Sequence, residues 1–202
     1  MTKSFIIVMS VTFSTIQIAF ADCANSSIPG YYVDRYLDKK DGTIVDSMTN
    51  LMWMKCDVHI LWNANNQTCQ HTEESFGSTV PVQRIEYTWQ EALSSASNIN
   101  TNGFAGFTDW RLPNIKELSS ILAIHCLNDN QSEPALNTQA FDGEAAFYWS
   151  STPSRNEIPT LDSAPAINQA WQVSFRSGSV LGARPVSIDN PMHVRLVRNN
   201  SQ

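Results

Sequence analysis

Two cysteines and two histidines in the first half of the chain could bind a metal or form a disulfide. Cys56 and His59 are followed, after a polar and asparagine-rich stretch, by Cys69 and His71. Two thiolates and two imidazoles make a tetrahedral zinc shell, although this spacing matches no standard zinc finger. A Cys56–Cys69 disulfide would instead close a loop of about a dozen residues and stabilise the fold by about 3 kcal/mol. We predict the disulfide and keep zinc as the alternative.

The start of the chain indicates the redox compartment. Lys3 precedes an apolar run over residues 5–11, and Ala19-Phe20-Ala21 has the small-x-small form that signal peptidase accepts. We therefore expect a signal peptide over residues 1–21 and a single exported domain over residues 22–202, in the periplasm, in the medium or on the cell surface. No later apolar run is long enough for a membrane helix, so we expect no transmembrane segment in the mature chain.

The four cysteines of an exported chain are expected to be oxidised. We pair Cys56 with Cys69 and Cys23 with Cys126, and the two other pairings stay open. Lipidation of Cys23 is disfavoured because Asp22 separates it from the expected cleavage point.

Residue patterns for catalysis are missing from the sequence. There is no Gly-x-Ser-x-Gly elbow and no phosphate-binding glycine-rich loop. His125 and His193 have no neighbouring carboxylate pattern that would orient a general base, so we assign them structural or surface roles. The sequence predicts a protein that is not an enzyme and needs no cofactor. A hydrolase is a weaker alternative, because it would require a pocket with a strongly perturbed acid or base.

Charge is distributed unevenly along the chain. The formal net charge of −6 disfavours nonspecific nucleic-acid binding, yet the segment from residue 171 onward has four arginines and one acid. Arg176, Arg184 and Arg198 lie at expected turns or strand ends, so we expect them to face water and to hold any anionic glycan through charge-assisted contacts.

Arg111 and Arg195 stand inside the two most structured motifs of the chain. We expect both to be buried or half-buried and to pair with carboxylates, Glu117 being one partner.

Aromatic and oxygen-rich residues suggest two further sites. Trp62 lies in the asparagine-rich loop and is the best candidate for an exposed ligand contact, with a plug for that loop as the other interpretation. We expect the other five tryptophans to be core residues. They are Trp53, Trp89, Trp110, Trp149 and Trp171. Asn128, Asp129, Asn130 and Glu133 before Pro134 could hold calcium, or form only a turn.

The element pattern predicts an α+β fold in which two helices pack on short antiparallel sheets joined by long loops. Capping boxes at Thr88/Glu91 and Asn114/Glu117 begin helices over residues 88–100 and 115–124. Strands are expected at residues 30–37, 43–45, 51–54, 147–151, 170–175, 179–183 and 193–198.

An ordered series of short motifs resembles one known family. The motifs are GTIVDSMTNLMW (42–53), TWQEAL (88–93), FTDWRLPNIKEL (107–118), YWSST (148–152), AWQVSF (170–175) and VRLVR (194–198). Together they resemble the C-terminal domain of the Legionella collagen-like adhesin. The Arg-Leu-Pro motif and the closing VRLVR run also resemble the C-type lectin-like fold of formylglycine-generating enzymes.

This resemblance implies a C-type lectin-like domain that is exported and acts at the bacterial surface, and the disulfides expected from the cysteine count would staple it. The named adhesin binds sulfated glycans and helps cells attach. The chain differs in having no collagen-like repeat, an acidic body and no cysteine after residue 126 for formylglycine-type chemistry. We therefore predict a noncatalytic domain for adhesion or glycan recognition. The alternative is a structural or assembly subunit of an envelope complex that binds protein. The oligomeric state stays open.

Overall fold

The computed structural model describes residues 35–70, 87–124, 134–154, 169–181 and 192–200, and these form an α+β fold. Several predictions fall outside the described residues. They are the signal peptide over residues 1–21, the Cys23–Cys126 pair, His71, His125, Arg184 and the calcium ligands between residues 128 and 133. Within the described ranges, no helix has both the length and the apolar character that crossing a membrane requires.

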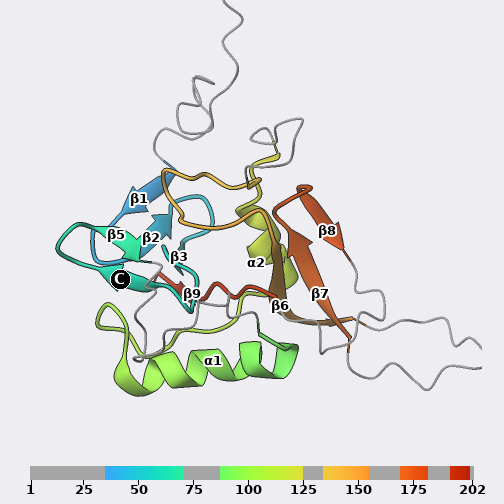
Figure 1. Cartoon of the computed structure of the whole chain (residues 1–202), viewed down its shortest axis with the longest axis horizontal. Coiled ribbons are helices and arrows are strands. Elements are labelled where there is room, and N and C mark those ends of the chain that lie inside the picture. The colour runs from blue at the N-terminus through green and yellow to red at the C-terminus, as the bar shows by residue number, and fades with distance from the viewer. Residues whose placement is uncertain (1–34, 71–86, 125–133, 155–168, 182–191, 201–202) are drawn as a thin grey trace, which may run out of the picture.

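A four-stranded antiparallel sheet joins the two ends of the described chain (Figure 1). Its strands are β1 (Tyr36–Asp38), β2 (Thr43–Asp46), β3 (Leu51–Met54) and β9 (Val197–Asn199), in the order β1-β2-β3-β9. The predicted strands over residues 43–45 and 51–54 are confirmed and pair as a hairpin, with Ile44 opposite Trp53 in the register. The last strand therefore closes onto a hairpin formed early in the sequence.

Two smaller antiparallel sheets complete the strand framework. β6 (Phe147–Ser154), β7 (Gln169–Ser174) and β8 (Ser179–Leu181) form a three-stranded sheet in sequence order. β4 (Leu61–Asn63) and β5 (Thr68–Gln70) form a separate hairpin, which the sequence indicated only as a polar loop. α2 (Ile115–Ser120) contacts β6 and β7, and α1 (Trp89–Asn102) contacts β6 and crosses the base of the molecule in Figure 1.

Both predicted capping boxes are present. In α1 the Thr88 hydroxyl accepts from the Glu91 N–H while the Glu91 carboxylate accepts from the Thr88 N–H, and Asn114 and Glu117 do the same in α2. The second helix is shorter than predicted and ends at Ser120. Its last two serines donate their hydroxyls to backbone carbonyls of the preceding turn, a competing interaction that disfavours continuation.

The prediction of one strand over residues 193–198 is wrong, because only Val197–Asn199 forms β9. The preceding residues divide their backbone bonds between two sheets. The Met54 N–H donates to the Leu196 carbonyl on one side, while the Trp149 N–H donates to the His193 carbonyl on the other. All residues from 192 to 198 are buried as a result.

Two apolar clusters form the core. Trp53, Phe141 and Tyr148 belong to one cluster, and Trp110 and Trp149 belong to the other. Trp53, Trp110 and Trp149 are buried as predicted, whereas Trp89 and Trp171 are half-buried. Leu93 is exposed, because α1 packs through the small side chains of Ala92, Ser95 and Ala96.

Candidate ligand-binding groove

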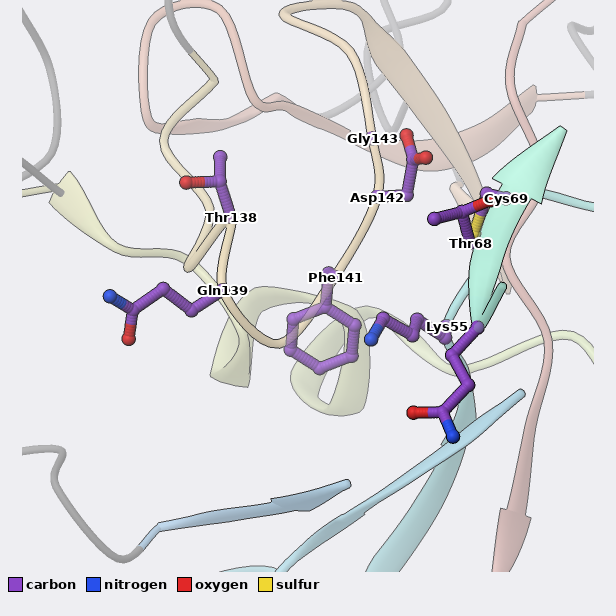
Figure 2. Close-up of a pocket in the computed structure, with 9 residues that line it drawn as sticks. Lys55, Thr68, Cys69, Thr138, Gln139, Phe141, Asp142 and Gly143 are labelled. Carbon is purple, nitrogen blue, oxygen red and sulfur yellow. The ribbon is translucent and has the colours of Figure 1, made fainter. Parts of the chain in front are cut away.

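An open groove of about 310 Å³ lies between the β4–β5 hairpin and the segment before β6 (Figure 2). We call the first side the hairpin wall and define it by Gln67, Thr68 and Cys69. The opposite side, the loop wall, consists of Thr138, Gln139, Asp142 and Gly143. Phe141 and Lys55 lie between the two walls in Figure 2 and complete the lining.

The disulfide fixes the hairpin wall. Cys56 and Cys69 are bonded, which confirms the predicted pairing, and the bond attaches β5 to the residues that follow β3. The zinc alternative is wrong for these two thiols, because the bond consumes both of them. At the hairpin turn, Gln67 has a φ of 57° and the Thr68 hydroxyl donates to Asn66 Oδ1 at 2.8 Å.

The loop wall is ordered by its own hydrogen bonds and by the core beneath it. Asn137 Oδ1 accepts from the N–H groups of Gln139 and Ala140, and its backbone carbonyl accepts from the Phe141 N–H. The Phe141 ring packs edge-on against Tyr36 and Trp53 and is only 1% exposed. The aromatic ring thus anchors the wall and leaves the exposed amide and hydroxyl groups to face the groove.

Lys55 places a cation at the base of the groove, but Asp38 already forms an ion pair with it. Lys55 Nζ lies 2.8 Å from Asp38 Oδ2 and 5.5 Å from the centre of the Trp62 ring. Burial raises the pKa of Asp38, and the hydrogen bonds from Lys55 and Lys40 outweigh it, so the pKa lies below its usual value. Asp38 therefore stays ionised and keeps the ammonium group paired.

Arg195 is a buried post that joins the base of the groove to the loop wall. Its guanidinium group donates to the backbone carbonyls of Met54, Lys55 and Asp142, and to Asp57 Oδ1 at 2.6 Å. The Asp142 N–H in turn donates to the Lys55 carbonyl. Because one rigid side chain holds both segments, the distance across this part of the groove does not depend on flexible surface contacts.

Gly143 is required by this arrangement. A Cβ atom there would lie 2.9 Å from Arg195 Nη2 and 2.8 Å from Leu136 Cδ2. The absence of a side chain therefore lets the loop wall approach the buried guanidinium group.

The charge of Arg195 is balanced by Asp57, which is completely buried. Asp57 Oδ2 accepts from the Tyr148 hydroxyl at 2.7 Å and lies 3.4 Å from His193 Nδ1. Burial raises the pKa of Asp57, but Arg195, His193 and Tyr148 outweigh burial and lower it below its usual value. Burial and the nearby Asp57 charge raise the pKa of Tyr148 well above its usual value. Neither perturbed group lines the groove, so both serve the fold.

The structure separates the arginines that were predicted to act together. Arg198 is 5% exposed, pairs with Asp109 at 2.7 Å and stacks on Phe107, so the prediction that it faces water is wrong. The reason is that its strand is covered on both faces. Arg176 is exposed as predicted and donates Nε to the Ala145 carbonyl, but it does not line the groove.

Arg111 and Arg195 pair with carboxylates, as predicted. Arg195 is buried on Asp57, and the half-buried Arg111 pairs with Glu117 at 2.7 Å. Burial raises the pKa of Glu117, but the Arg111 guanidinium group outweighs it and lowers the pKa.

Trp62 is half-buried, and its packing agrees with the plug interpretation. A Cβ at Gly42 would lie 2.8 Å from Trp62 Cγ, which shows how closely the indole ring approaches that backbone. Lys55 Nζ stands over the same ring system. Trp62 supports the hairpin beside the groove and is not among the residues that line it.

Sequence reasoning missed the groove itself. Gln67, Thr138, Gln139 and Asp142 carry no motif, and their types are ordinary for exposed loops. The one useful indication was the Cys56–Cys69 pair. A disulfide that closes a polar loop next to an aromatic strand indicates that the loop has a fixed conformation.

The fold and the groove define a class: an α+β domain with a stapled hairpin beside a polar groove. The chain belongs to the Lcl C-terminal domain family, whose model matches residues 42–198, and this confirms the resemblance. Membership in this family indicates a surface-associated domain. No curated protein and no solved structure gives a significant match.

Proposed function

We propose that this chain is an exported, noncatalytic domain that recognises a glycan in the groove at the bacterial surface. One observation carries the proposal. The open groove has exposed amide and hydroxyl side chains on both walls, namely Gln67, Thr68, Thr138 and Gln139. Such groups both donate and accept hydrogen bonds, as sugar hydroxyls do. Family membership and the predicted signal peptide support the surface location. We also propose that the fold is related to the C-type lectin-like fold.

The noncatalytic part of the proposal rests on where the perturbed groups lie. Among the described residues, Asp46, Asp57 and Tyr148 have displaced pKa values and are fully buried. Asp38 lies beside the groove, and its pKa is lowered because it is held in the ion pair with Lys55. Catalysis requires such groups to reach a substrate. The groups that line the groove suit binding better than bond cleavage.

A glycan array probed with the purified, disulfide-bonded chain tests the proposal. We expect retention on at least one glycan and a loss of about tenfold in affinity for a Thr138→Ala/Gln139→Ala variant, because each lost hydrogen bond weakens binding by about 0.5–1.5 kcal/mol. Gln90→Ala, on the exposed side of α1, is the matched control and should bind like wild type. Failure to retain any glycan, or equal binding by the double variant, would contradict the proposal.

A triple alanine variant of Arg176, Arg184 and Arg198, the arginines expected to hold an anionic glycan, is a poorer test. Arg198→Ala would break the ion pair with Asp109 and remove a stacked side chain, so lost binding could reflect lost stability. The changes at Thr138 and Gln139 avoid this ambiguity because both side chains are exposed.

The alternative function, an assembly subunit that contacts protein, has one observation in its favour. The strand β8 exposes Val180 and Leu181, apolar side chains at a sheet edge within the described residues. Mild periodate oxidation of a target surface destroys sugars, whereas protease treatment removes proteins. Binding that is lost with periodate and survives protease favours the glycan, and the reverse result favours the assembly subunit.

A further inference from the structure

Resting on the proposed glycan recognition, we infer that the groove selects neutral saccharides and discriminates against sulfated or carboxylated chains. The inference names the ligand class of the same groove. It follows from the net charge of the lining residues, the ion pairs that Lys55 and Arg198 already form, and the size of the groove.

The lining residues carry one positive and one negative side chain, Lys55 and Asp142, and the rest are neutral. Their formal charges therefore cancel. The hydrogen-bonding capacity is large, because each glutamine amide offers two donors and an acceptor oxygen and each threonine hydroxyl does both. A ring with several hydroxyl groups and no charge matches this set.

The charge of Lys55 is already balanced by Asp38. Its ammonium group is 2.8 Å from Asp38, and its side chain is only 16% exposed. An anionic ligand would have to share the ammonium group with Asp38, which also pairs with Lys40 at 3.1 Å on the exposed surface. A second anion beside Asp38 brings little net gain, since the two negative charges repel each other.

The described arginines that were expected to hold an anion do not supply the missing positive charge. Arg198 is buried and forms an ion pair with Asp109, and Arg176 does not line the groove. The net charge of −6 also opposes the approach of a polyanion. Both the local and the long-range electrostatics therefore favour an uncharged ligand.

The aromatic groups near the groove contribute little stacking surface. Phe141 lines the base but is only 1% exposed, and the Trp62 ring packs against Lys55 and the Gly42 backbone. Recognition thus depends on hydrogen bonds to ligand hydroxyls. The volume of about 310 Å³ is at the small end of the range of about 300–1,000 Å³ for small-molecule sites. It suits the end of a saccharide chain better than a long internal stretch.

The test is a glycan array that pairs neutral oligosaccharides with their sulfated and uronic-acid counterparts, read at about 0.1 M and about 1 M sodium chloride. The Debye length falls from about 10 Å to about 3 Å between these conditions. We expect binding to the neutral members, with less than about a twofold change with salt because no ion pair is formed. Gln139→Ala should weaken it about three- to tenfold, and Arg176→Ala, the matched cationic control, should leave it unchanged.

Tighter binding of the sulfated members, a steep loss with salt or a dependence on Arg176 would overturn the inference and leave glycan recognition intact. Retention of no glycan from any class would instead overturn the proposed function. The two failures are therefore distinguishable.

Discussion

At the residue scale, the two arginines of the closing VRLVR motif show what local reasoning can and cannot decide. Arg195 and Arg198 are three positions apart in extended chain, so their side chains leave the backbone on opposite faces. Arg195 packs near Phe141 and pairs with Asp57, while Arg198 stacks on Phe107 and pairs with Asp109. Both are buried because residues 192–198 lie between two sheets and are covered on both sides. The sequence does not reveal this placement.

Gly143 offers a test at this scale of the connection between the core and the groove. Gly143→Ala places a Cβ within 2.9 Å of Arg195 Nη2, so the guanidinium group must shift. We expect the free energy of unfolding to fall by about 1–3 kcal/mol, as for other overpacked sites, and glycan binding to weaken. Denaturant titration and array binding measure the two effects.

Gly106→Ala is the control for that change. Gly106 has a φ of 81° and open space around the Cβ position, so the substitution should cost about 1–2 kcal/mol through backbone strain alone and leave binding unchanged. If Gly143→Ala is neutral in both measurements, the connection between Arg195 and the loop wall has no energetic weight.

At the element scale, local signals and long-range closure contribute differently. The two capping boxes lie within a few residues of each helix start and were visible in the sequence. The β4–β5 hairpin was not, because its strands, LWN and TCQ, are only three residues long and too short to show an alternating pattern. It is held by the disulfide and by Trp62, rather than by strand propensity.

We expect a Cys56→Ser/Cys69→Ser variant to lower the free energy of unfolding by about 3 kcal/mol, because the unfolded chain regains the entropy of the loop. Amide hydrogen exchange should accelerate in residues 61–70, while the β2 and β3 amides stay protected by the core clusters. Dithiothreitol should not change exchange in this region of the variant, although it should in wild type. Unchanged hairpin exchange in the variant would show that Trp62 and the turn suffice.

At the scale of the whole molecule, buried and half-buried carboxylates couple stability to pH. Burial raises the pKa values of Asp46, Asp57 and Glu117, but their partners Arg35, Arg195 and Arg111 outweigh burial and lower all three. The folded pKa values therefore lie below the unfolded ones. These groups contribute stability above the unfolded values of about 4, and the contribution is lost as the pH falls through the folded values.

Denaturant titrations between about pH 7 and about pH 2 should show stability that is nearly flat at the upper end and falls steeply below about pH 4. Asp57→Asn should lower stability at neutral pH by about 3–5 kcal/mol, since it leaves Arg195 buried without its counter-charge, and should make the acid slope shallower. Lys116→Ala, on the exposed side of α2, controls for a surface charge change. An unchanged acid slope in Asp57→Asn would show that Asp57 does not contribute to the pH dependence of stability.

The sequence by itself determined the features that depend on near neighbours. These are the two capped helices, the 43–54 hairpin, the Cys56–Cys69 pair, the Arg111–Glu117 pair and the family. Only the tertiary structure decided that Arg198 is buried and that Gln67, Thr138 and Gln139 surround one groove. Burial and grooves arise from which segments pack together over long sequence separations, and the type of an isolated residue does not encode its neighbours in space.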